Sequence, residues 1–214
     1  MSHGQYVDKA DLKTYIGISG SGQDTNIDNA IDGASRQIDR ICGRNFWQDD
    51  SVTDKHYTPI SNLFLDTADI STATGLVVKL DTTDDGTHDT TLTINTDFIL
   101  TPVNPRETKI TGGTTYYEPY TQIKILDTRS SERFDPDIIN NVKVTAKFGF
   151  SIVPEDIKQA TLIQALRLFK RKDTPFNVFG NEQTGTIELF NRFDPDAMAL
   201  LKRWRKNTLT GIKL

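Results

Sequence analysis

The 214-residue chain contains a single cysteine, Cys42, and only three histidines. One cysteine cannot form an intrachain disulfide, and its place on the apolar side of an expected helix favours buried packing over a reactive thiol. His3, His56 and His88 lie in different segments, and none has a second ligand at metal spacing. The sequence therefore indicates no zinc or iron site, no catalytic histidine and no cofactor.

Long apolar runs are also missing. No window approaches the roughly 18 uninterrupted apolar residues that span a bilayer. The opening stretch MSHGQYVDKADL lacks the apolar core of a signal peptide. We therefore expect no membrane partner and a protein made in the cytoplasm. With 36% hydrophobic and 25% charged residues, the composition is that of a globular protein large enough to bury a core.

Motifs for catalysis or ion binding are incomplete. The glycine-rich stretch GSGQDT lacks the Gly-Lys-Ser/Thr ending of a phosphate-binding loop, which favours a linker. The stretch DTTDDGTHDTTL has Asp81, Asp85 and Gly86 where a calcium loop has them, but Leu92 stands where a bidentate Glu is needed. A β-turn is the better interpretation. No Ser, Cys or Lys has a nucleophile's local signature, so the sequence predicts a protein that is not an enzyme.

Two helices are predicted near the N-terminus. The stretch VDKADLKTYIG has Asp8 as N-cap and Gly17 as its stop. A second helix, capped by Asp24 or Thr25, ends at Gly43. Its apolar residues recur at three- and four-residue spacing: Ile27, Ala30, Ile31, Ala34, Ile38 and Ile41. This narrow stripe is typical of a helix packed on one side only.

Residues 51 to 150 have a different character, with 20 threonines and several alternating runs. The runs GLVVKL, TTLTIN, DFILTP, YTQIKIL and NVKVTAKFGF predict strands. The turn signal DDGTHD separates the first two and predicts a hairpin. We therefore expect a small antiparallel β module, inserted between helical segments rather than appended at one end.

A helix from Pro154 to residue 172 follows, and its apolar residues surround about two thirds of its circumference. They are Ile157, Leu162, Ile163, Ala165, Leu166, Leu168 and Phe169. A surface helix of a self-contained domain needs an apolar stripe only about 100° wide. This helix is therefore either central in its domain or shared with a neighbouring chain.

The last segment is basic. After an irregular loop over residues 173 to 193, Asp194 caps a helix with Met198, Leu201 and Trp204 inward. Residues 151 to 214 carry 11 basic and 7 acidic side chains, although the whole chain has a net charge of −4. The cations around Trp204 have two explanations of equal weight. They complement the dipoles of helix ends, or they form a docking surface anchored by arginine and tryptophan.

Taken together, these patterns predict an α+β fold with about four helices and an inserted antiparallel β module. Residues 1–50 and 151–214 would form the helical core, and residues 51–150 the β module.

This layout resembles a known family. The quoted stretches are ASRQIDRICGRNFW, TDKHYTP, VKVTAKFGF and VPEDIKQATLIQALRLFKRKDTP, and the most specific parts are residues 34 to 47 and 142 to 175. They resemble the head–tail connector (head-completion adaptor) family of tailed bacteriophages. Members of that family form a dodecameric ring beneath the portal of a filled capsid. The ring extends the DNA channel and offers a platform for the next tail component.

The resemblance implies a virion neck protein of infected cells whose partners are the portal protein, a downstream neck or tail-completion protein and further copies of itself. Genomic DNA would pass without specific binding. It implies portal docking through the C-terminal part; the candidates are Arg203, Trp204, Arg205, Lys206 and Ile212. We expect the basic tail within residues 195–214, which includes Trp204, to be mobile in the free protein and to order on docking. It also implies a subunit interface in the ring, with Leu162, Ile163, Leu166 and Phe169 as candidates. The long β insertion departs from shorter members and leaves its position on the ring open.

Two other functions are compatible with the sequence. The β insertion could recognise a ligand or host glycan in a tail or baseplate binding module. A weaker hypothesis is DNA binding through a set of cations: Lys170, Arg171, Lys172, Lys202, Arg203, Arg205 and Lys206. The acidic body of the chain argues against tight phosphate contacts.

Overall fold

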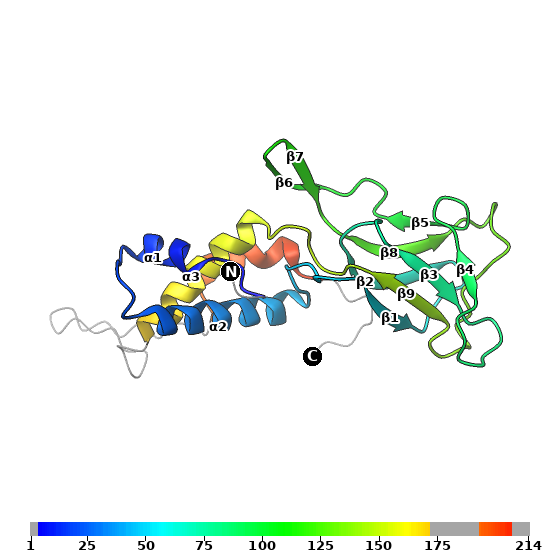
Figure 1. The fold of residues 1–214 in the computed structure, drawn as a ribbon, viewed down its shortest axis with the longest axis horizontal. Coiled ribbons are helices and arrows are strands. Elements are labelled where there is room, and N and C mark those ends of the chain that lie inside the picture. Colours follow the sequence, from blue (N-terminus) through cyan, green and yellow to red (C-terminus); the bar gives the residue numbers. More distant parts are fainter. Residues whose placement is uncertain (1–3, 172–192, 207–214) are drawn as a thin grey trace. The chain divides into compact units, whose positions relative to one another are not determined.

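The computed structural model describes residues 4–171 and 193–206. The chain forms two units, a helical unit spanning Met1–Phe46 and Val153–Leu214 and a β unit spanning Trp47–Ile152 (Figure 1). The predicted α+β class is confirmed. Within the described ranges, no helix combines the length and the apolar character that crossing a membrane requires.

The helical unit contains four α-helices and a 3₁₀ turn among its described residues. They are α1 (Lys9–Ile16), α2 (Asp24–Cys42), α3 (Glu155–Arg171), α4 (Pro195–Leu201) and η1 (Lys202–Trp204). Gly17 ends α1 in the left-handed region, and its N–H donates to the carbonyl of Lys13. The last helix is shorter than predicted, because α4 gives way to η1 after Leu201.

Helix α3 is the central helix of this unit, since it packs against α1, α2 and α4. Ala165 and Phe169 join the buried side chains of α1 and α2 in one cluster, and Leu162, Leu166 and Leu168 pack against that cluster while partly exposed. Because three neighbours surround α3, most of its wide apolar face is accounted for inside the unit. The narrower stripe predicted for α2 is confirmed, with Ile27, Ile31 and Ile38 fully buried.

The β unit consists of antiparallel sheets. A four-stranded sheet has the order β1-β9-β3-β4, a three-stranded sheet the order β2-β8-β5, and β6 pairs with β7 alone. The strands are β1 (Thr53–Tyr57), β2 (Phe64–Ile70), β3 (Val77–Leu80), β4 (Thr90–Leu92), β5 (Phe98–Thr101), β6 (Glu107–Thr111), β7 (Thr114–Tyr117), β8 (Tyr120–Ile125) and β9 (Val142–Ala146). The β6–β7 hairpin projects from the two larger sheets of its unit (Figure 1).

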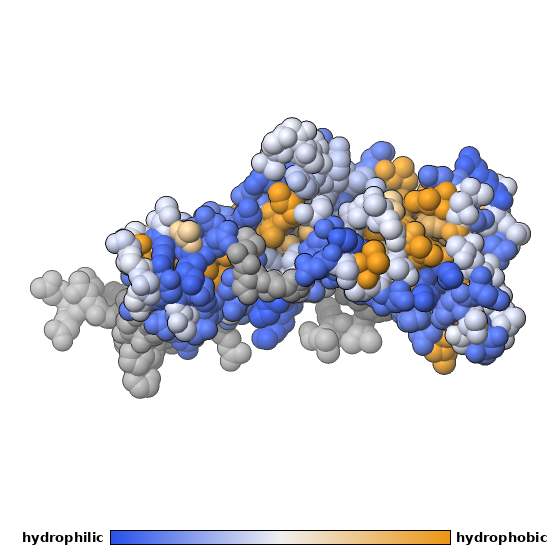
Figure 2. Space-filling model, in the orientation of Figure 1, coloured by the Kyte–Doolittle hydropathy of each residue, from blue (hydrophilic) through white to orange (hydrophobic). Residues whose placement is uncertain are grey.

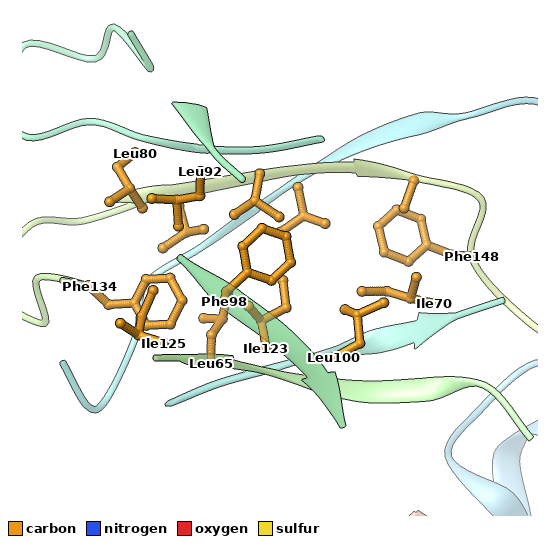
Figure 3. Close-up of a cluster of buried hydrophobic side chains, with 14 residues drawn as sticks. Leu65, Ile70, Leu80, Leu92, Phe98, Leu100, Ile123, Ile125, Phe134 and Phe148 are labelled. Carbon is orange, nitrogen blue, oxygen red and sulfur yellow. The ribbon is translucent and has the colours of Figure 1, made fainter. Parts of the chain in front are cut away.

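The core of the β unit lies between the two larger sheets. Leu80 and Leu92 of the first sheet and Phe98 and Ile123 of the second belong to the same buried cluster (Figure 3). Alternate side chains of each strand point to one face of its sheet, so each sheet contributes one apolar face to this shared core.

The predicted β3–β4 hairpin is confirmed, and its loop explains the incomplete calcium pattern. Asp81 is 2% exposed, and its carboxylate accepts backbone N–H groups from Thr83, Asp85 and Gly86, the last at 2.8 Å. Burial raises the pKa of Asp81, but these backbone donors together lower it further, to below its usual range. The acidic side chain thus organises a turn.

The chain enters and leaves the β unit at one tightly packed point. The N–H of Asp49 donates to the carbonyl of Phe148 at 2.9 Å, and the N–H of Phe150 donates to the carbonyl of Trp47 at 3.3 Å. Between them, Gly149 has a φ of 100°, and a Cβ there would lie 1.7 Å from the Trp47 oxygen. Only glycine fits this position.

Candidate docking surface

Trp204, the expected anchor of the docking surface, lies in the interior of the helical unit. It is 3% exposed, and its ring meets the ring of Phe46 edge to face with the centroids 5.9 Å apart. Its Nε1–H donates to the Asp156 carboxylate at 3.2 Å, and the Arg203 guanidinium lies 4.4 Å from the indole ring centre. Trp204 therefore holds η1 against the unit and presents almost no surface of its own.

The cations beside Trp204 complement a different helix from the one that carries them. The N–H of Lys206 donates to the carbonyl of Cys42 at 2.8 Å, and the Arg205 Nε donates to the carbonyl of Ile41 at 3.3 Å. These carbonyls belong to the last turn of α2, whose C-terminal groups lack partners within the helix and carry partial negative charge. Dipole complementation thus accounts for the Arg205 side chain, whereas Lys206 binds α2 through its backbone.

Lys202, Arg203 and Arg205 are exposed and form what we call the C-terminal cationic face. The Arg203 side chain is 48% exposed and lies 3.8 Å from Asp156, so it is only loosely paired with that carboxylate. A guanidinium can bind a carboxylate or phosphate with two parallel hydrogen bonds. The C-terminal cationic face can therefore bind an acidic surface, while the buried Trp204 side chain fixes the backbone that carries these cations.

A buried polar network supports the same region from the other side. The Tyr6 hydroxyl donates to Asp39 and accepts the N–H of Phe46 at 3.0 Å, and Arg36 pairs with Asp39 at 3.2 Å. Burial, followed by the bond to Asp39, raises the pKa of Tyr6 far above its ordinary value, so the hydroxyl stays protonated. Tyr6 also meets the Phe46 ring edge to face at 5.7 Å. The N-terminal segment, α2 and Trp204 are thus connected through Phe46.

Three polar residues of this region escaped the sequence reasoning. They are Tyr6, Asp39 and Asp156, and no sequence motif marks any of them. A partner 48 positions away in the chain, as for Asp156 and Trp204, leaves no local signal in the sequence. For Tyr6, the one sequence signal is its position just before the first helix, and this does not reveal its contact with Asp39.

The candidate interface residues of α3 differ in burial. Phe169 is 7% exposed and belongs to the core. Leu162 and Leu166 pack partly against that core, and Ile163 is half-buried without belonging to it. The remaining docking candidate, Ile212, lies outside the described residues, as does the segment 207–214.

The cations proposed for DNA binding do not form one patch. Trp204 contacts Asp156 at the start of α3, whereas Arg167 near its end lies 3.9 Å from Asp194, which precedes α4. Helix α4 and η1 therefore run antiparallel to α3. Asp156 and Lys170 are separated along α3 by about 21 Å at a rise of 1.5 Å per residue. Lys170 and Arg171 thus lie at the opposite end of α3 from the C-terminal cationic face, and Lys172 is outside the described residues.

The residues that the structure describes contain no cluster of three or more potential metal ligands. Cys42 is 1% exposed, and burial raises the pKa of its thiol to about 11, which makes it a poor nucleophile at neutral pH.

An open groove on α1 and α2 is lined by Asp8, Asp11, Asp28 and Asp32, of which Asp28 pairs with Lys9 at 2.7 Å.

Among the residues that the structure describes, the large apolar side chains with the highest exposed fractions lie in the β unit. Among them, Ile60 is 82% exposed, Ile139 76%, Val103 65% and Ile110 64%. In the view of Figure 2, the surface is mainly polar with apolar patches. Loops carry Ile60 and Ile139, and a bond from the N–H of Asn140 to the Thr58 hydroxyl, 2.9 Å long, holds these loops together.

Comparison with known proteins found similarity of structure but not of sequence. No family model and no curated protein matches the chain. A chain in the neck of an empty gene transfer agent (GTA) particle, computed with C6 symmetry, is 14% identical with a TM-score of 0.50, and the match covers 99% of this chain and 95% of that one. A chain in the virion of a native GTA particle is 16% identical with the same TM-score and coverage. The resemblance stated from the sequence is confirmed at the level of the fold.

Proposed function

We propose that this protein is a head–tail connector, a structural protein that forms a ring beneath the portal of a phage-like particle. The observation that carries the proposal is the fold match over 99% of the chain to a protein in a symmetric GTA particle neck. The match includes the β unit as well as the helices. The ring would extend the DNA channel and offer a platform for the next neck or tail protein.

In a closed ring each copy presents two different surfaces to its neighbours. We assign one of these surfaces to α3, where Ile163 is half-buried outside the core cluster and Leu162 and Leu166 keep part of their surface exposed. Phe169 supports this surface from within the core. The wide apolar face therefore has two roles, since most of it is internal and the remainder is available to a neighbouring copy.

The C-terminal cationic face is the proposed contact with the portal. The positive charge of this face comes from Lys202, Arg203 and Arg205. The buried Trp204 fixes the backbone that carries them, and the backbone N–H of Lys206 binds the carbonyl of Cys42 at the end of α2. Ile212 would add an apolar contact beyond the described residues. Such a preorganised charged surface favours fast and salt-sensitive association with an acidic partner.

Binding to purified portal tests the proposal. The double variant Lys202→Glu/Arg203→Glu should abolish cosedimentation with portal, because it places two negative charges against an acidic surface. The matched control Lys170→Glu/Arg171→Glu reverses the same number of charges at the other end of α3. It should bind portal as the unchanged protein does. An equal loss of portal binding in both variants would show that net charge, and not this face, determines binding. Normal binding by Lys202→Glu/Arg203→Glu would contradict docking through this face.

A DNA titration separates this function from the weaker hypothesis. A channel protein should bind duplex DNA only weakly, since tight phosphate contacts would slow ejection, and the two basic groups are too far apart to act as one patch. Fluorescence anisotropy at physiological salt should show no Kd below about 1 μM, which is the tightest value typical of nonspecific DNA binding. Tighter binding would favour a DNA-binding protein.

A further inference from the structure

The β unit brings together two histidines that are distant in the sequence. His56 lies on β1, and His88 lies in the loop between β3 and β4. Strands β1 and β3 both pair with β9, so their ends are close in the same sheet. The two imidazole rings lie with their centres 5.1 Å apart and their planes inclined by 58°. The two histidines lie in different sequence segments without metal spacing between them, and the fold brings their rings together.

A backbone carbonyl fixes the orientation of His88. Its Nε2 lies 2.8 Å from the carbonyl oxygen of Asn140, and because a carbonyl only accepts, Nε2 carries the proton in the neutral ring. Nδ1 is then the atom with a free lone pair. Asn140 itself is held in the left-handed region, with a φ of 58°, while its N–H donates to Thr58. Histidines that bind metals commonly donate their other ring N–H to such a carbonyl.

The separation of the rings suits a shared metal ion. A zinc ion lies about 2.0 to 2.1 Å from an imidazole nitrogen, which places the ring centre roughly 3.2 Å from the metal. Two rings bound to one tetrahedral ion then have centres about 5 Å apart. The observed 5.1 Å between the ring centres agrees with this value.

The charges near the pair have both signs, since Lys79 on β3 lies opposite Lys143 of β9. Lys143 pairs with His56 across the sheet, but its ammonium lies 3.0 Å from the carboxylate of Asp54. Asp54 is two residues before His56, on the same face of β1. The lysine beside the pair is thus neutralised by a carboxylate on the face that carries His56.

We propose that His56 and His88 bind a divalent transition metal such as Zn²⁺ or Ni²⁺, with water in the remaining positions. The part of the chain that the structure describes supplies no three-ligand cluster, so the expected affinity is modest and the ion is exchangeable. Bound metal would link β1 to the β3–β4 loop and, through Asn140, to the loop before β9. The site is independent of the proposed function.

Isothermal titration of the full chain, without an affinity tag, with ZnCl₂ and separately with NiCl₂ tests this site. One equivalent should bind at neutral pH. His56→Ala and His88→Ala should each weaken binding about tenfold or more, because each removes one of two protein ligands. His3→Ala removes the remaining histidine and serves as the matched control, with unchanged binding expected.

Thermal unfolding gives a second measurement. Zinc should raise the melting temperature of the unchanged protein and of His3→Ala, but not of His56→Ala or His88→Ala, since the ion binds the folded pair. Circular dichroism in the absence of metal checks that the exposed His56 and the partly exposed His88 can be replaced without loss of fold. Unchanged zinc affinity in either single variant, or no saturable binding to the unchanged protein, would overturn the proposal.

Discussion

Replacing Trp204 with alanine should destabilise the helical unit strongly. The side chain is 3% exposed, contacts the Phe46 ring and donates to Asp156, so its removal leaves a cavity and breaks both contacts. Truncation of a buried tryptophan to alanine costs about 3 to 5 kcal/mol. A domain of this kind has a total stability of roughly 5 to 15 kcal/mol. If Trp204 were an exposed anchor of the docking surface, its replacement would leave the helices intact, and its burial predicts the opposite.

Urea unfolding measures this cost. Circular dichroism at 222 nm follows the helices, and the fluorescence of Trp47, the other tryptophan, follows the β unit after Trp204 is removed. The helical transition should move to much lower urea while the Trp47 transition stays, provided that the two units unfold separately. Trp204→Phe is the control. It keeps an aromatic ring against Phe46, loses the bond to Asp156 and should cost less. A loss below about 1 kcal/mol in Trp204→Ala would refute the interior position of this side chain.

Further predictions follow from single residues. Gly149→Ala should unfold or strongly destabilise the β unit in a thermal melt, because the new Cβ would lie 1.7 Å from a backbone oxygen. Ile163→Asp should leave a folded monomer that fails to form rings in size-exclusion chromatography with portal, whereas Phe169→Asp, at a core position, should lose helical signal. Cys42, with its raised pKa and burial, should react with iodoacetamide at pH 8 only when urea unfolds the helical unit. The pKa of Asp81 is lower in the folded protein than in the unfolded chain, so its ionised carboxylate stabilises the fold above the unfolded pKa. This stabilisation is lost as the pH falls through the folded pKa. Below about pH 4 the β unit should therefore lose stability more steeply than it does in Asp81→Asn.

Local structure could be predicted from the sequence because its signals are local. The three- and four-residue spacing of α2, the left-handed Gly17 and the proline before α3 each determine a helix boundary without help from distant residues. Strands β3 and β4 were recognised by alternation and by the turn between them. The α+β class follows from these elements.

The candidate site could not be predicted in the same way, because its geometry depends on contacts between distant segments. The pattern of α3 showed a wide apolar face but could not distinguish neighbours within the unit from a neighbouring chain. Trp204 among cations has the composition of an exposed anchor, yet its partners Phe46 and Asp156 lie far away in the sequence. The pairing of His56 with His88 likewise depends on the order of strands around β9.

The stretches that carried the family resemblance have structural roles that explain why they are specific. Phe46 and Trp47 are consecutive but serve different units: the Phe46 ring packs against Tyr6 and Trp204, and the Trp47 carbonyl oxygen lies where a side chain on residue 149 would have to be. The first contact needs an aromatic ring, and the second needs a glycine in the returning strand. The sequences RNFW and KFGF supply this aromatic ring and this glycine, Phe46 where the chain enters the β unit and Gly149 shortly before it leaves.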